Sequence, residues 1–201
     1  KPKIDEERVI LRKLAAEFCM DNARKAIEKG DRKEAEKWLT TIVQKLPGEP
    51  QAAEAAKILD ELFTVERAKR EETVVSKAPP DLLKTDLKQG KYYYDQMIKF
   101  AKQGLTSPGG SPQAINAWES SISNGGSALK EIDKVEKKYT DAPTRETLTG
   151  YTKLVNGQII EVRLNLASLY TTRSSYNKAL GEVNQALAIE PENAQALAAR
   201  A

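Results

Sequence analysis

Hydrophobic side chains recur every three or four residues along most of this 201-residue chain. An α-helix has about 3.6 residues per turn, so this spacing places them on one side of a helix that packs along its length. In residues 81–105 the steps alternate between four and three, through Leu83, Leu87, Gly90, Tyr94, Met97 and Ala101. The pattern predicts an all-α fold.

The N-terminal third has the features of a helical hairpin followed by a third helix. A helix over residues 5–28 is predicted to end at Gly30, and Asp31 is suited to cap the next helix, with Glu34 reaching back to it. That second helix passes through Trp38 and ends before Pro47. Apolar residues at helical spacing in the first two helices are Ile10, Leu14, Phe18, Ile27, Ile42 and Val43.

The third helix is predicted to begin near Pro50. It carries Ala53, Ala56, Ile58, Leu59, Leu62 and Phe63. It then enters the charged residues 65–77, VERAKREETVVSK, which we interpret as either a solvated helix end or a linker, closed by Ala78, Pro79 and Pro80.

Two further long helices are predicted after residue 105. Ser111 and Pro112 are suited to cap and start the first of them. Its apolar positions are Ile115, Trp118, Ile122, Gly125, Leu129, Ile132 and Val135. The second, residues 143–172, would be about 45 Å long. It carries Leu148, Val155, Ile159, Val162, Leu166 and Leu169.

The segment SNGGS, residues 123–127, allows two interpretations. Asn-Gly and a pair of glycines favour a turn. The apolar pattern, however, passes through Gly125 in phase, so we favour a continuous helix. In an antiparallel set, Gly90, Gly125 and Gly157 would lie at one height, where the helices approach closely.

Small, apolar and aromatic residues recur at fixed spacings in residues 160–193, followed by a proline: Leu166, Ala167, Tyr170, Ala179, Val183, Ala186 and Pro191. With these positions the segment resembles the tetratricopeptide repeat, a 34-residue helical hairpin. Arg163 stands where the family often has Trp. A fainter copy over residues 16–49 places Ala23, Ala35, Leu39 and Pro47 at the corresponding spacings, with Ala26 and Ile42 in the Tyr and small-residue positions.

The resemblance implies tetratricopeptide-like hairpins flanking a bundle of longer antiparallel helices. We divide the chain into residues 1–78, 79–142 and 143–201. The resemblance also implies a concave surface that binds a peptide or partner domain. Its residues by position are Glu17, Met20, Arg24, Glu161, Leu164, Asn165 and Ser168. Asn165 has no Lys beside it, so no clamp for a terminal carboxylate is predicted.

Composition argues against several other functions. Histidine is absent, which removes the commonest general base and metal ligand, and Cys19 is the only cysteine and is predicted to be a small buried side chain. No catalytic residue, metal site or cofactor is predicted. The 32 basic and 29 acidic residues are interspersed and give a net charge of +3, which does not favour nucleic acid. No apolar run approaches the roughly 20 residues needed to span a bilayer.

The sequence therefore predicts a protein-binding scaffold that is not an enzyme. The alternative is an assembly protein whose long helices make homo-oligomeric or envelope-associated contacts through an apolar patch within residues 81–139. Of the run Tyr92 to Tyr94, Tyr94 is assigned to the core. The chain lacks an initiator Met and stops inside a predicted helix, so we expect a fragment of a longer protein and leave its compartment and any upstream signal or anchor open.

Overall fold

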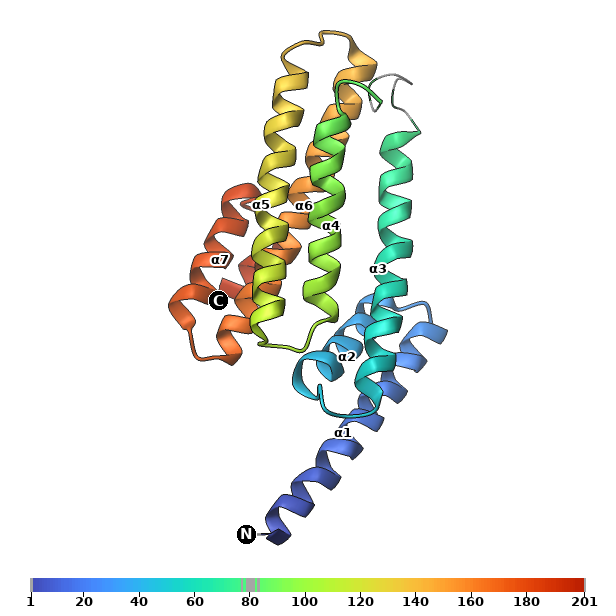
Figure 1. Cartoon of the computed structure of the whole chain (residues 1–201), viewed down its shortest axis with the longest axis vertical. Helices are drawn as coiled ribbons and strands as arrows, with labels where there is room; N and C mark the ends of the chain where they lie inside the picture. The colour runs from blue at the N-terminus through green and yellow to red at the C-terminus, as the bar shows by residue number, and fades with distance from the viewer. Residues whose placement is uncertain (1, 77, 79–81, 83, 201) are drawn as a thin grey trace. The chain divides into compact units, whose positions relative to one another are not determined.

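The chain is all-α, as predicted. The structure, a computed structural model, describes residues 2–76, 78, 82 and 84–200, and side chains from residue 7 onward. Its helices are α1 Pro2–Glu28, α2 Arg32–Lys45, α3 Gln51–Val75, α4 Lys88–Thr106, α5 Pro112–Glu136, α6 Ala142–Thr172, α7 Tyr176–Ile189 and α8 Ala194–Arg200 (Figure 1). No β-strand occurs among these described residues.

The helices form two compact units. Unit 1 comprises Lys1–Glu66 and Gly104–Ala114, and unit 2 comprises Arg67–Gln103 and Ile115–Ala201. This division differs from the three consecutive ranges predicted from sequence, because helices α3, α4 and α5 each contribute residues to both units.

Unit 1 contains the predicted α1–α2 hairpin. Gly30 has φ +72°, which a glycine adopts without steric cost, and the Asp31 carboxylate caps α2 by accepting from the Glu34 amide at 3.1 Å. The reciprocal part of the predicted capping box is wrong. The Asp31 amide donates to the Ala26 carbonyl at 2.9 Å, and the Glu34 carboxylate instead accepts from Lys37.

The core of unit 1 lies between α1, α2 and the start of α3. Its buried members are Cys19, Met20, Ala23, Leu39, Ile42, Val43, Ala55 and Leu59. Cys19 is buried as predicted, and burial raises the pKa of its thiol, with a smaller opposing effect from Lys45. Of the alanines at the start of α3, Ala53 is exposed and Ala55 is buried.

In unit 2 the end of α3 joins α4, α5 and α6 in an antiparallel set. Ser121 on α5 donates its hydroxyl to the Met97 carbonyl on α4 at 2.8 Å. The rings of Tyr94 on α4 and Tyr151 on α6 meet edge to face with centroids 6.0 Å apart. The sequence left the charged end of α3 as a solvated end or a linker, but it is helical through Val75 and packs against this bundle.

Helix α5 is continuous through SNGGS, as favoured from the apolar pattern. A Cβ on Gly125 would lie 2.8 Å from Ile159 Cγ1 and 2.9 Å from Met97 Sδ, so the glycine permits close packing with α4 and α6. The predicted alignment of three glycines is wrong. Gly90 faces Glu131, which follows Gly125 on α5 by six residues, and a Cβ on Gly157 would meet nothing within 4 Å.

Helix α4 is shorter than predicted. It begins at Lys88, and residues 82 and 84–87 form turns in which the Leu87 amide donates to the Leu82 carbonyl. The predicted seam positions Leu87, Tyr94, Met97 and Ala101 are buried. Asp81 and Leu83, also part of that prediction, lie outside the described residues, as do Pro79 and Pro80.

Helices α6 and α7 pack against each other near the C-terminal end of the chain. Ala167, Ala179, Val183 and Ala186 are buried together, with Tyr170 packed at the edge. Helix α8 covers this cluster through Ala196, and Asn193 caps α8 by accepting from the Ala196 amide at 3.0 Å.

Candidate protein-binding surface

One side of helix α6 presents the predicted residues Glu161, Asn165 and Ser168. They follow one another at intervals of four and three residues, so they share a side of the helix, and we call them the α6 strip. The neighbouring residues Val162, Leu166 and Leu169 are buried in unit 2. Buried contacts on the other sides of α6 therefore hold the α6 strip in a fixed orientation.

The polar groups of the α6 strip differ in what they contact. Glu161 accepts from Arg70 of α3 at 2.9 Å, in an ion pair whose two side chains are 40% and 50% exposed. Such an exposed pair contributes little to stability. Ser168 is exposed, and the half-buried Asn165 amide makes no hydrogen bond to any other residue that the structure describes. The strip thus offers donors and acceptors to a partner.

Leu164, the remaining residue nominated on α6, is only partly accessible. It packs against the apolar cluster between α6 and α7. Arg163, in the position where the resembling family often has Trp, forms an ion pair with Glu182 of α7 at 2.6 Å, with both side chains largely buried. An ion pair with little exposure therefore joins α6 to α7.

The residues nominated on α1 do not form a comparable strip. Met20 is 2% exposed and belongs to the core of unit 1, so it cannot line a surface without unfolding the hairpin. Arg24 is exposed and pairs with Glu54 of α3 at 2.9 Å. Glu17 is exposed and makes no ion pair with another described residue. Of this set, only Glu17 keeps an unengaged charge at the surface.

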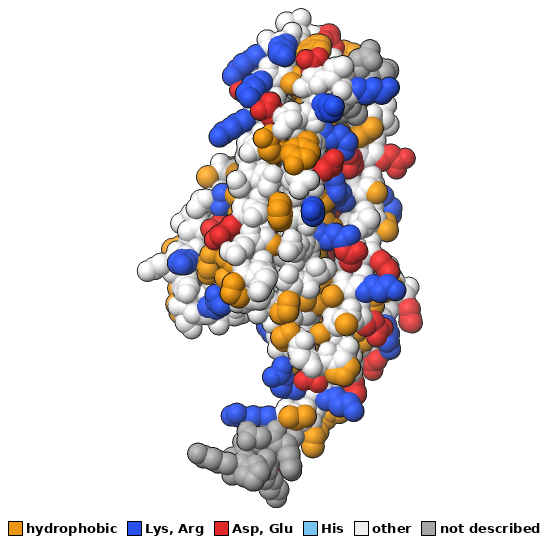
Figure 2. Space-filling model, in the orientation of Figure 1, with side chains coloured by type: hydrophobic (Ala, Val, Ile, Leu, Met, Phe, Trp, Pro, Cys, Tyr) orange, Lys and Arg blue, Asp and Glu red, His pale blue; other side chains and the backbone are white. Residues whose placement is uncertain are grey.

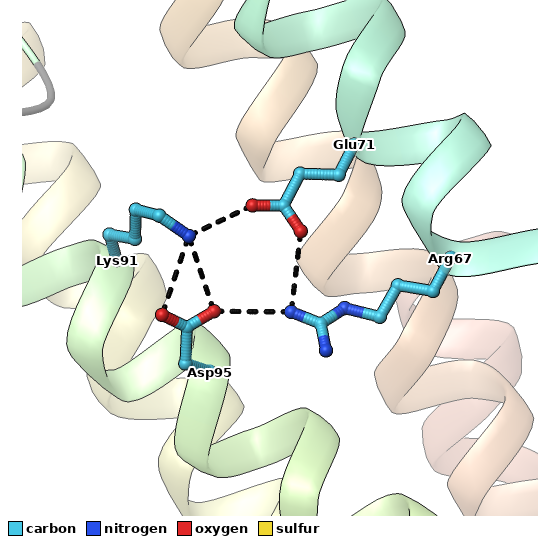
Figure 3. Close-up of polar contacts among 4 residues, drawn as sticks. All are labelled: Arg67, Glu71, Lys91 and Asp95. Carbon is cyan, nitrogen blue, oxygen red and sulfur yellow. Dashed lines mark hydrogen bonds and ion pairs between the residues drawn. The ribbon is translucent and has the colours of Figure 1, made fainter. Parts of the chain in front are cut away.

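A four-residue charge cluster in unit 2 was not anticipated from the sequence. Arg67 and Glu71 on α3 face Lys91 and Asp95 on α4 (Figure 3). Lys91 Nζ lies 2.8 Å from Glu71 and 3.3 Å from Asp95, and Arg67 lies 3.4 Å from Glu71 and 3.1 Å from Asp95. Each cation thus contacts both anions, and the cluster carries no net charge.

The charge cluster lies against aromatic rings. The Arg67 guanidinium is 4.9 Å from the centre of the Tyr94 ring. Burial lowers the pKa of Lys91, but its bond to Glu71 and the charges of Glu71 and Asp95 outweigh this, and the net pKa is raised. Burial also raises the pKa of Tyr94 and Tyr151. These raised pKa values keep the Lys91 ammonium charged and both phenols neutral at pH 7. The ion pairs of the cluster attach α3 to α4.

The described part of the chain contains no group of three or more Asp, Glu, Cys or His that could hold a metal ion. A shallow, open depression on α4 and α5 is lined by Tyr93, Ser127, Glu131 and neighbouring lysines. One of these lysines, Lys134, forms an ion pair with Glu131. Over the face shown in Figure 2, acidic and basic side chains are interspersed, as the composition indicates.

No protein-family model, curated protein or solved structure matches the chain. The tetratricopeptide resemblance therefore stays a prediction from residue spacing. Among the described residues, no helix combines the length and apolar character needed to cross a bilayer.

Proposed function

We propose that this protein is an interaction scaffold that binds a peptide or a partner domain through the α6 strip. The proposal rests mainly on Asn165, whose amide lacks a hydrogen-bond partner among the described residues although it lies on a helix packed on its other sides. A side-chain amide offers both donors and an acceptor, so it can bind the backbone of a peptide without requiring a particular side chain.

Ser168 and Glu161 extend the same surface by one turn in each direction. Ser168 adds a hydroxyl, and Glu161 adds a negative charge whose partner Arg70 is half-exposed. A basic partner side chain can share or displace Arg70, because an exposed ion pair is weak. We therefore expect a partner segment with backbone groups free to bind Asn165 and a Lys or Arg near Glu161.

The proposal is tested by selecting peptides from a displayed library against the whole chain and measuring their dissociation constants. In Asn165→Arg/Ser168→Arg, two long charged side chains would cover the α6 strip. The affinity of the selected peptides should fall at least about tenfold, because binding energy concentrates in a few central contacts.

The matched control is Asn177→Arg/Ser123→Arg, which makes the same two changes at exposed positions on α7 and α5. It should bind the peptides as the parent chain does. Equal loss in both variants would show a nonspecific charge effect, and binding unchanged in the α6 variant would reject the α6 strip as the site.

The described residues add no support to the alternative of assembly through the long central helices, which an exposed apolar patch there would favour. In residues 82 and 84–139, Tyr92 is the one large hydrophobic side chain that is exposed. Among the described residues, more of the exposed large apolar side chains lie on α1 than on any other helix.

A further inference from the structure

Helix α1 carries apolar residues on two opposite sides. Ala16, Cys19, Met20 and Ala23 are buried in the core of unit 1. On the other side lie Ile10, Leu11, Leu14 and Phe18, which are 58%, 64%, 54% and 62% exposed, and we call these the outer stripe. At 100° per residue the two sets point about 180° apart, so the outer stripe is not an edge of the core.

The outer stripe is unusual for a surface helix. An exposed side of such a helix normally carries polar residues, and single exposed apolar side chains are common, but a contiguous row marks an interaction site. The rings of Phe18 and Trp38 meet edge to face, with centroids 5.8 Å apart, and most of the Phe18 side chain stays exposed. Figure 1 shows the start of α1 extending past the beginning of α3.

The charged residues beside the outer stripe are complementary to the same residues of a second copy of the chain. Lys13 and Glu17 lie on the same flank of the stripe, one turn apart, and neither forms an ion pair with another described residue. When two identical helices pair antiparallel, each flank meets the same flank of its partner, as at the edges of a coiled coil. Lys13 of each copy then faces Glu17 of the other.

A single register satisfies both the apolar and the charged contacts. If the two-fold axis passes between residues 14 and 15, Leu11 lies at the height of Phe18 in the second copy and Leu14 lies beside its counterpart. Lys13 and Glu17 are then offset by one residue, or about 1.5 Å, which their flexible side chains span. A parallel pairing would bring the Lys13 flank against the opposite flank, which carries Arg8.

We propose that the outer stripe of α1 binds a second copy of this chain in an antiparallel, two-fold symmetric helix pair. The contact is isologous, with Leu11, Leu14 and Phe18 in its centre and two reciprocal Lys13–Glu17 ion pairs at its edge. It uses a helix and residues separate from the α6 strip, so it does not depend on the proposed function.

Sedimentation equilibrium of the whole chain over about 1 to 100 µM tests the proposal, a range in which helix pairs of moderate affinity dissociate. The average mass should rise with concentration from 22.3 kDa toward twice that value. Leu14→Glu should stay monomeric with unchanged helix content, because Leu14 is exposed. Leu180→Glu on α7, at an exposed apolar position outside the outer stripe, should associate as the parent does.

Charge reversal tests the register. Lys13→Glu and Glu17→Lys should each raise the dissociation constant roughly tenfold, because each places like charges in both reciprocal pairs. An equimolar mixture of the two variants should associate more tightly than either alone, since every edge contact is then between opposite charges. The double variant Lys13→Glu/Glu17→Lys should recover the parent affinity.

Three outcomes would overturn the proposal. The first is a parent chain that is monomeric throughout the range. The second is association that Leu14→Glu leaves unchanged. The third is a mixture of the two charge variants that associates no better than its components, which would reject the antiparallel register.

Discussion

At the scale of single residues, adjacent glycines in α5 have different roles. Gly125 is buried, and an added Cβ would lie under 3 Å from Ile159 and Met97, whereas a Cβ on Gly126 would meet nothing within 4 Å. Both are helical, so alanine would improve the local helix propensity equally at either site. Any difference between the two substitutions measures the packing of α5 against α4 and α6.

We expect Gly126→Ala to stabilise the protein by about 0.5–1 kcal/mol, since it only lowers the entropy of the unfolded chain and adds helix propensity. Gly125→Ala gains the same helix propensity, but overpacking against Ile159 and Met97 costs about 1–3 kcal/mol, so this variant should be less stable than the parent. Urea unfolding followed by circular dichroism gives both values. Equal stabilisation by the two variants would show that the helices move apart at no cost.

Asp141 makes the stability of the folded protein depend on pH. Its carboxylate caps α6 by accepting hydrogen bonds from the Thr144 side chain and from the Thr144 amide, the latter at 3.0 Å. These two hydrogen bonds hold the pKa of Asp141 below its usual value. A lowered folded-state pKa stabilises the protein above the unfolded pKa of about 3.9, and this stability is lost as the pH falls through the folded pKa.

Asn also caps helices but does not titrate, so Asp141→Asn should lose less stability than the parent on acidification. Melting temperatures measured from pH 6 to pH 2 should converge or cross as the pH falls. Parallel curves would show that the Asp141 carboxylate is not coupled to folding.

At the scale of helices, charge attaches the end of α3 to its bundle. Arg67, Glu71, Lys91 and Asp95 form the charge cluster between α3 and α4, and Val74 packs beside Gly150 of α6. A charged segment of this kind gives no apolar periodicity to detect. The sequence therefore left this end of α3 ambiguous, although it is part of the bundle.

Removing one cation should destabilise this attachment more than removing all four charges. In Lys91→Met, Glu71 and Asp95 share Arg67 alone, and we expect a loss of about 1–2 kcal/mol because the cluster is partly exposed. In Arg67→Met/Glu71→Leu/Lys91→Met/Asp95→Leu, no charge stays unpaired, and stability should match or exceed that of the parent. Chemical denaturation of both variants distinguishes the cases, and a quadruple variant weaker than Lys91→Met would contradict this explanation.

At the scale of the whole molecule, the two compact units share unbroken helices. Helices α3, α4 and α5 each contribute residues to unit 1 and to unit 2, so unfolding either unit frays helices that the other requires. Each unit also contains one tryptophan, Trp38 in unit 1 and the fully buried Trp118 in unit 2.

We expect one cooperative unfolding transition. In Trp38→Phe, fluorescence reports Trp118 alone, while far-ultraviolet circular dichroism reports the helices of both units. The two signals should give the same midpoint in a urea titration. Separate midpoints would show that the units unfold independently and that the shared helices break at the unit boundary.

Local interactions account for what could be predicted from the sequence. Helical periodicity predicted the all-α fold, and single side chains predicted the caps at Asp31 and Ser111, because those hydrogen bonds close within three residues. The continuous α5 was also predictable, since the apolar pattern keeps its phase through Gly125. The α6 strip could be nominated from helical spacing and the resemblance.

Contacts between distant residues decided the rest. The burial of Met20 depends on α2 and α3, and the pairing of Arg24 with Glu54 joins α1 to α3. The charged end of α3 is held in position by Lys91 and Asp95 of α4. Gly90 lies opposite Glu131 because of the register of α4 against α5. Spacing within one helix defines which residues share a side, but the neighbouring helices decide which side is buried, and their positions arise only when the chain folds.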